Sequence, residues 1–298
     1  MTTTDLPVRI APAAPRRTGV GVAAVAAVLN TTARLSPRVA GRLALELWRR
    51  PGRPVGVRAG ERAVHDAARV EVVEHAGSEV TTYAWGDGAR PVLVVHGWGA
   101  RASRFADVVA ALLATGHSPV AYDAWGHGAT RGPVRTILEH RAVVGELERR
   151  HGPFVGVVAH SFGVPVALYA VRTGLSADRV VAVSGMGDFG YLVDTFCDRL
   201  GLDARVGVAL RRAIERNWFA GDTGIWADFS PQAVPGTEVL VVHDAGDRVV
   251  DRGQADVLVA ALGDGTRLVE TTGLGHGRIL HDPAVVAEAV AFLDGAPT

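Results

Sequence analysis

The chain has 298 residues and no net formal charge at pH 7, with 48% hydrophobic and 21% charged residues. These values fit a soluble protein with one large α/β domain and exclude a wholly disordered chain. The single cysteine, Cys197, excludes an intramolecular disulfide and a multi-thiolate metal site. All 31 cationic side chains are arginines, and the lack of lysine excludes Schiff-base chemistry and a phosphate-loop lysine.

The first 58 residues form a basic leader. They contain ten arginines and two acidic residues, a local charge of +8. An apolar run at 19–29 has the length of a signal-peptide hydrophobic region but is too short to span a bilayer. Ser36 and Pro37 then begin an amphipathic helix that runs through Trp48. We expect two helices that pack on the domain or on a second subunit, where they would be a candidate homodimer surface.

The cellular location follows from how this leader is interpreted. Packed N-terminal helices predict a cytoplasmic protein without membrane association, which also suits a cysteine-poor chain. The alternative is export or attachment to a membrane surface through residues 16–50, whose arginines would face anionic lipid.

From residue 69 onward, short apolar runs alternate with longer helical patterns. The predicted strands are 69–75, 78–85, 92–96, 119–123, 154–159, 179–184, 238–243 and 267–271, and the predicted helices are 101–115, 136–150, 162–173, 251–262 and 283–293. Five strands are almost unbroken Val, Leu and Ala, which is typical of parallel strands covered on both faces. The first two runs predict an antiparallel edge hairpin. The pattern indicates a doubly wound, mostly parallel eight-stranded α/β sheet flanked by helices.

About fifty residues separate the sixth and seventh predicted strands, and a bare loop of that length is unusual. Their helical pattern predicts an inserted cap at 185–236, between core segments 69–184 and 237–296. Seven of the 18 aromatic residues lie in this insertion: Phe189, Tyr191, Phe196, Trp218, Phe219, Trp226 and Phe229. They would either form the roof of an apolar pocket or attach the insertion to the domain.

The strongest local motif surrounds Ser161. An apolar strand, Val157-Val158-Ala159-His160, runs directly into Ser161-Phe162-Gly163 and a helix. A serine on such a turn is exposed at a helix N-terminus, and it needs small residues two positions before and after, here Ala159 and Gly163. A serine before a helix can also be only a helix cap.

Two further strand ends carry glycine-rich turns. The first, Val95-His96-Gly97-Trp98-Gly99, would let the N–H of Trp98 join that of Phe162 in an oxyanion hole. In the second, at 120–128, we interpret Asp123 and His127 as residues that fix the loop rather than as catalytic groups.

A nucleophilic serine needs a histidine base and an orienting carboxylate. His276 follows the last predicted strand, at the same sheet edge as Ser161, and Asp247 follows the strand before it, with Asp188 as a second choice for the acid. We expect His96 and His160 to be structural residues beside the pocket and His281 to lie too far into the next helix. The predicted pocket lining is His96, His160, Met186, Phe189, Trp218 and Trp226.

Taken together, these motifs resemble the α/β-hydrolase fold over roughly residues 69–296. The resemblance is carried, in order, by HGWG at 96–99, YDAWGHG at 122–128, AHSFG at 159–163, HDAGDRVV at 243–250 and GLGHG at 273–277. It implies Ser161 as nucleophile, Asp247 as acid, His276 as base, Trp98 and Phe162 as oxyanion donors, and a cap at 185–236. The sequence departs from the family pattern at Ala159, where glycine is usual, and at Val164-Pro165.

The resulting hypothesis is a serine hydrolase that cleaves an ester, thioester or related acyl bond of a small to medium apolar substrate. Carbon–carbon bond hydrolases, acyltransferases and perhydrolases share the triad, and a weakly catalytic ligand-binding protein is the alternative outside catalysis. The histidine spacing and the glycine pattern predict no metal and no dinucleotide cofactor, and the neutral charge predicts no nucleic-acid partner.

Overall fold

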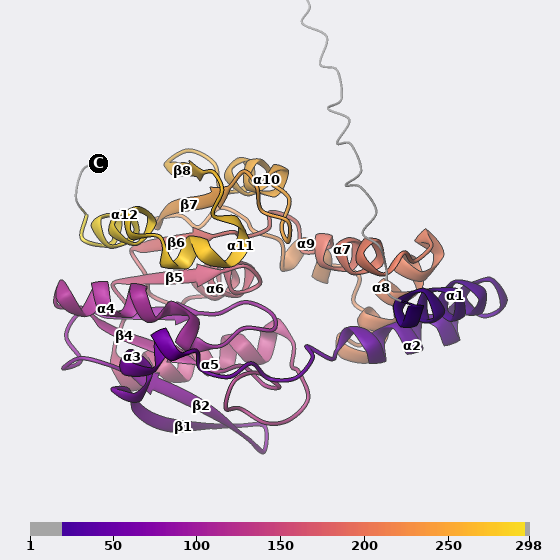
Figure 1. The fold of residues 1–298 in the computed structure, drawn as a ribbon, viewed down its shortest axis with the longest axis horizontal. Coiled ribbons are helices and arrows are strands. Elements are labelled where there is room, and N and C mark those ends of the chain that lie inside the picture. Colours follow the sequence, from indigo (N-terminus) through magenta and orange to yellow (C-terminus); the bar gives the residue numbers. More distant parts are fainter. Residues whose placement is uncertain (1–19, 296–298) are drawn as a thin grey trace, which may run out of the picture.

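A computed structural model describes residues 20–295, so the first 19 residues of the predicted leader lie outside the described chain. Eight strands form one sheet in the order β1-β2-β4-β3-β5-β6-β7-β8 (Figure 1). Their bounds are β1 Arg69–His75, β2 Ser78–Ala84, β3 Pro91–Val95, β4 Ser118–Tyr122, β5 Gly156–His160, β6 Arg179–Val183, β7 Glu238–Asp244 and β8 Thr266–Thr271. Strands β3 to β8 run parallel, whereas β1 and β2 form an antiparallel hairpin at one edge. The predicted fold class is confirmed.

The central strands are buried on both faces because helices cover both. In β3, Leu93 and Val95 enter one core while Val92 and Val94 enter the other. The first core includes α5 (Ile137–His151), α6 (Gly163–Arg172) and α10 (Gly253–Leu262); the second includes α4 (Ala106–Ala114) and α12 (Pro283–Leu293). This two-sided burial explains the unbroken apolar runs.

Local sequence signals set several helix starts. Thr136 caps α5 by accepting a hydrogen bond from the Leu138 N–H, and the Glu139 carboxylate accepts one from the Thr136 N–H. Together these bonds make a complete capping box. Asp282 caps α12 in front of Pro283. Short elements complete the core: α3 (Arg62–Asp66), α11 (Gly275–Arg278) and the 3-10 helices Ala59–Glu61, Ala102–Phe105 and Ile279–His281.

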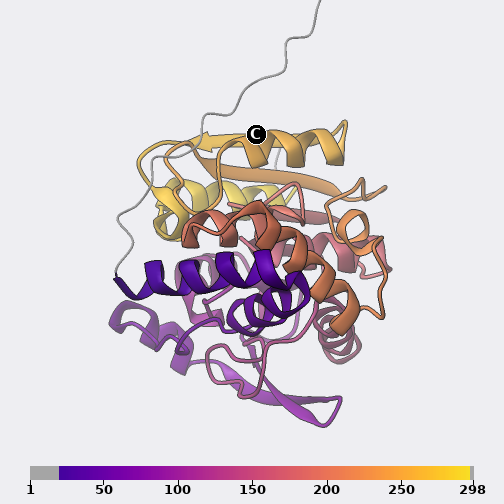
Figure 2. The same cartoon turned by 90° about the vertical axis from the view of Figure 1, so that its right-hand side faces the viewer.

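The segment between β6 and β7 contains three helices, α7 (Tyr191–Leu200), α8 (Ala204–Trp218) and α9 (Ile225–Asp228). The N-terminal helices α1 (Val20–Leu35) and α2 (Pro37–Trp48) pack beside α7 and α8, at one end of the sheet (Figures 1 and 2). The predicted pair of N-terminal helices therefore packs within its own chain. A homodimer through the outer face of these helices stays a prediction.

Within residues 20–295, no helix combines the length and the apolar character that crossing a bilayer requires. The 16-residue α1 ends in Arg34 and Leu35, and α2 is amphipathic, with its buried face made of Ala40, Gly41, Ala44 and Leu45.

Candidate active site

Ser161 lies on a strained turn between β5 and α6. Its φ of +56° places a non-glycine residue in the left-handed region, which is uncommon and typical of residues held for function. The turn is possible because two glycines leave space around it. A Cβ on Gly97 would lie 2.7 Å from the Ser161 Cβ, and a Cβ on Gly163 would lie 2.3 Å from the Val95 carbonyl oxygen. The smallest residues are therefore required at both positions.

The turn after β3 faces this serine. Trp98 and Phe162 come from separate loops, yet their rings meet edge to face with centroids 5.9 Å apart. Within the described part of the chain, neither of their backbone N–H groups donates a hydrogen bond to the protein. Unused N–H donors at the wall of a cavity are the donors that an oxyanion hole requires. The oxyanion role of both residues stays a prediction.

Asp247 and His276 form a hydrogen-bonded pair. The His276 Nδ1–H donates to Asp247 Oδ2 at 2.7 Å, and the Asp247 side chain is fully buried. The other carboxylate oxygen accepts the N–H groups of Val249 and Val250. Burial acts to raise the pKa of Asp247, but the bond from His276 and the two N–H groups outweigh it and hold that pKa below its ordinary value. Asp247 is thus an anion that fixes the orientation of the His276 ring.

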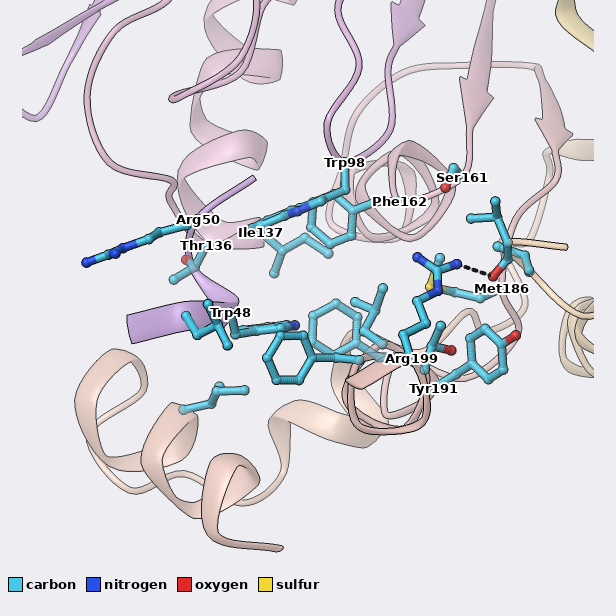
Figure 3. A pocket seen from close by; sticks show the side chains of 18 of the residues that line it. Trp48, Arg50, Trp98, Thr136, Ile137, Ser161, Phe162, Met186, Tyr191 and Arg199 are labelled. Atoms are coloured by element: carbon cyan, nitrogen blue, oxygen red, sulfur yellow. Dashed lines mark hydrogen bonds between the residues drawn. The ribbon is translucent and has the colours of Figure 1, made fainter. Parts of the chain in front are cut away.

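Ser161 and His276 line the same cavity of about 570 Å³, which opens between the sheet edge and helices α2, α7 and α8 (Figure 3). No hydrogen bond joins the Ser161 hydroxyl to His276 in the described structure, and the Nε2 atom of His276 has no protein partner there. The structure therefore joins two of the three predicted triad members directly and places the third on the shared wall. The catalytic roles of all three residues stay predictions.

Three of the six predicted pocket residues line the cavity: Met186, Phe189 and Trp218. The other three lie behind its wall. Trp226 packs against Phe189, and its indole N–H donates to Glu215 at 2.7 Å, so it supports the lining without reaching it. His96 and His160 are turned into the protein by hydrogen bonds to neighbouring loops, which corrects the prediction for these positions.

Both of these histidines hold the site in place. His160 donates from Nε2 to the His276 carbonyl oxygen at 2.8 Å, which fixes the loop that carries the predicted base. Burial and the neighbouring His276 lower the pKa of His160 to about 3, so it stays neutral. His96 accepts the Ala124 N–H at 3.0 Å and donates to the Gly97 carbonyl oxygen at 2.8 Å. It thereby ties the loop after β3 to the loop after β4.

The carboxylates set aside by the sequence analysis have other partners. Asp123 is fully buried and accepts hydrogen bonds from Tyr83, Arg101 and the Ala102 and Ala129 N–H groups. It fixes the loop after β4, as predicted. Asp188, the second choice for the acid, accepts the Gly190 N–H at the start of α7 and does not line the cavity.

The other side of the cavity is formed by residues that were not predicted from the sequence. Leu47, Trp48 and Arg50 reach it from the end of α2, more than one hundred residues before Ser161 (Figure 3). Tyr191 and Arg199 reach it from α7. The available signal was the small-residue face of the helix that ends at Trp48, because such a face needs a close partner. Nothing in the sequence identified α8 as that partner.

The residues at this site do not resemble a metal centre. Across residues 20–295, no three or more His, Cys, Asp or Glu side chains are arranged to hold a metal ion. The histidines of the site bind carboxylate, carbonyl or N–H groups instead.

Comparison with known proteins agrees with this fold. The family described as "Alpha/beta hydrolase family" matches residues 92–289, about two thirds of the chain, so the protein belongs to the α/β-hydrolase family. No curated protein sequence matches it significantly.

Solved structures of the same fold include several hydrolases. An esterase from Rhodococcus sp. ECU1013 superposes with a TM-score of 0.54 at 17% identity, covering 78% of this chain and 100% of its own. The thioesterase domain from the curacin biosynthetic pathway gives 0.55 at 17% identity, covering 76% and 99%. A monoacylglycerol lipase from Paleococcus ferrophilus gives 0.56 at 20% identity, covering 73% and 99%. At such identities the likeness shows the fold, and the matched family makes the protein a hydrolase of the α/β fold.

Proposed function

We propose that this protein is a serine hydrolase that cleaves an ester or thioester of an apolar acid through an acyl-enzyme intermediate. One observation carries the proposal: a strained serine and a carboxylate-bound histidine line one apolar cavity. A cavity of about 570 Å³ lies within the usual range for small-molecule sites.

In the proposed mechanism, His276 takes the hydroxyl proton as the Ser161 oxygen attacks the acyl carbon. This step requires the Ser161 hydroxyl to reach the Nε2 atom of His276, which has no protein partner in the described structure. The N–H groups of Trp98 and Phe162 stabilise the developing oxyanion, each contributing on the order of 3 kcal/mol. Asp247 stabilises the imidazolium, and His276 then returns the proton to the leaving group. Water, activated by His276, releases the acid.

The direct test replaces the nucleophile. Ser161→Ala should lower kcat for an activated short-chain ester by about 10⁵-fold or more. The matched control is Ser184→Ala, because Ser184 also ends a buried strand with a positive φ of 48° but does not line the cavity. Full activity in the Ser161 variant, with circular dichroism unchanged, would defeat the proposal.

Charge favours a second candidate, the hydrolysis of thioesters or esters that carry an anionic group. Among the described residues, three arginines (Arg50, Arg135 and Arg199) and no carboxylate line the cavity. Unbalanced positive charge around an apolar pocket attracts an acyl compound with a phosphate or carboxylate on its leaving group. The curacin thioesterase domain is one hydrolase of similar fold named for a thioester.

Ionic strength separates this candidate from a neutral ester. The kcat/KM for an acyl-coenzyme A should fall steeply with salt, and that for a neutral nitrophenyl ester should not. Arg50→Gln should weaken the first substrate selectively, whereas Arg212→Gln, on the exposed face of α8, should leave both unchanged. Equal salt dependence of kcat/KM for both substrates would contradict a preference for substrates with an anionic group.

A further inference from the structure

The end of helix α2 is built into the cavity, although it lies outside the matched family segment. Leu47 and Trp48 in the last turn, and Arg50 just after it, line the cavity. Trp48 and Arg50 lie across the cavity from Ser161 (Figure 3). The family match begins at residue 92. The proposed site therefore includes a wall that comes from outside the matched family segment.

Close packing holds this wall in position. A Cβ on Gly41 would lie 2.3 Å from the Ala209 carbonyl oxygen, so the backbones of α2 and α8 touch at that point. Helix α1 adds a second attachment through Asn30. Its side-chain amide donates to the Gly201 carbonyl oxygen at 3.1 Å, and its side-chain oxygen accepts the Asp203 N–H at 2.8 Å. The N-terminal helices are thus fixed to the turn between α7 and α8.

Trp48 connects this wall to the predicted oxyanion loop. Its ring is stacked on that of Trp98, with centroids 6.1 Å apart and planes 17° apart. The Trp218 ring of α8 also lies next to Trp48, with centroids 5.6 Å apart and planes 31° apart. Trp98 in turn contacts the Phe162 ring edge to face. A continuous row of aromatic rings therefore runs from α8 through α2 to both residues that would supply oxyanion donors.

We infer that Trp48 is a specificity-determining residue for long apolar acyl chains and a positioning residue for the oxyanion loop. The inference rests on the proposed hydrolase function and assigns a substrate class to the same site. A long apolar chain buries itself against the Trp48 ring, whereas an acetyl group is too short to reach it. The stack on Trp98 restrains the loop for every substrate, whatever its chain length.

The two roles predict different kinetic effects in Trp48→Ala. Its KM should rise about tenfold for a dodecanoyl nitrophenyl ester, because apolar contact is lost, and stay unchanged for the acetyl ester. Its kcat should fall about tenfold for both esters, because the oxyanion donors are held less firmly. Trp48→Phe keeps an aromatic ring and should restore most of both losses. The matched control is Leu43→Ala, because Leu43 also lies on α2 but is 45% exposed and does not line the cavity.

A binding measurement separates this inference from the hydrolase proposal. Calorimetric binding of dodecanoate needs no turnover, and its affinity should fall about tenfold in Trp48→Ala but not in Leu43→Ala. If wild-type protein binds dodecanoate in this pattern yet hydrolyses no ester, the hydrolase proposal fails and the assignment of the wall holds. If Trp48→Ala matches Leu43→Ala in binding and in both kinetic parameters, the inference is overturned. A KM change of equal size for acetyl and dodecanoyl esters would also overturn it.

Discussion

The floor and the roof of the cavity are built in different ways. The floor consists of Trp98, Ser161, Phe162 and His276, each of which lies in a short motif after a strand of one sheet. The roof consists of the lining residues of α2, α7 and α8, which come from two segments separated by the core fold. Local sequence therefore specifies the groups that would react, and long-range helix packing specifies the shape that would select a substrate.

Their chemistry differs in the same way. The floor is held by hydrogen bonds with defined partners, such as Asp247 to His276 and His160 to the His276 carbonyl oxygen. The roof is held by aromatic stacking, by backbone contact at Gly41 and, at its outer end, by the hydrogen bonds of Asn30. Changes in the floor should thus act on kcat, and changes in the roof on substrate preference. Trp48 is the exception, because its stack on Trp98 also connects the roof to the floor.

The largest effect expected after loss of the nucleophile is that of Asp247→Asn. The amide cannot stabilise the His276 imidazolium and favours the wrong tautomer, so kcat should fall by about 10⁴-fold with little change in KM. Asp188→Asn is the control, because Asp188 was the second candidate for the acid and does not line the cavity. Comparable losses of kcat in the two variants would contradict the assignment of Asp247 as the acid of the triad.

A smaller effect, on stability, is expected from Gly163→Ala. The added methyl would meet the Val95 carbonyl oxygen at 2.3 Å, so the turn or the strand must shift. Overpacking of this kind costs about 1–3 kcal/mol in the free energy of unfolding, which denaturant titration measures. Gly60→Ala, with open space around the new methyl, should cost much less. If both variants unfold alike, the turn is looser than the structure indicates.

The pH dependence of stability should be a gentler effect. His140 is buried beside Tyr122, and burial, followed by the neighbouring His96 and His127, lowers its pKa to about 3 from 6.5. The unfolded chain therefore takes up this proton first, and stability present above pH 6.5 is lost as the pH falls from 6.5 toward 3. In that window, His140→Gln should reduce the slope of unfolding free energy against pH by about 1.4 kcal/mol per pH unit.

Tyr122→Phe provides the matched control for this slope. It removes the 2.8 Å hydrogen bond to His140 without removing the histidine, so it should lower stability at every pH and leave the slope almost unchanged. If the slope in His140→Gln equals that of the wild type, His140 takes up its proton at the same pH in the folded protein as in the unfolded chain, and its pKa is not lowered by folding.

Much of the core could be predicted from the sequence, because unbroken runs of apolar residues indicate strands that are buried on both faces. The predicted strand at 154–159 corresponds to β5, Gly156–His160, and the predicted helix at 283–293 coincides with α12. Asp247 and His276 could be placed at one sheet edge because both follow parallel strands. Their hydrogen bond depends on loop geometry, including the buried Asp244, which accepts the Leu274 N–H and so holds the His276 loop.

The roof could not be predicted because helix packing between distant segments leaves no local pattern. The sequence indicated that the helix ending at Trp48 would pack on the domain or on a second subunit, but not that Trp48 would meet Trp98 and Trp218. Trp226 was predicted to line the cavity but does not. It belongs to the aromatic-rich insertion, yet its bond to Glu215 holds it behind the lining.

Labelling by a fluorophosphonate probe is the sharpest test of Ser161 as the nucleophile, because the probe reacts with an activated serine and needs no knowledge of the substrate. We predict one covalent adduct, located by mass spectrometry on the peptide that contains Ser161, formed by the folded protein and lost after denaturation. Ser161 is not the nucleophile if wild-type protein hydrolyses esters but carries no adduct on Ser161, or carries it on another residue.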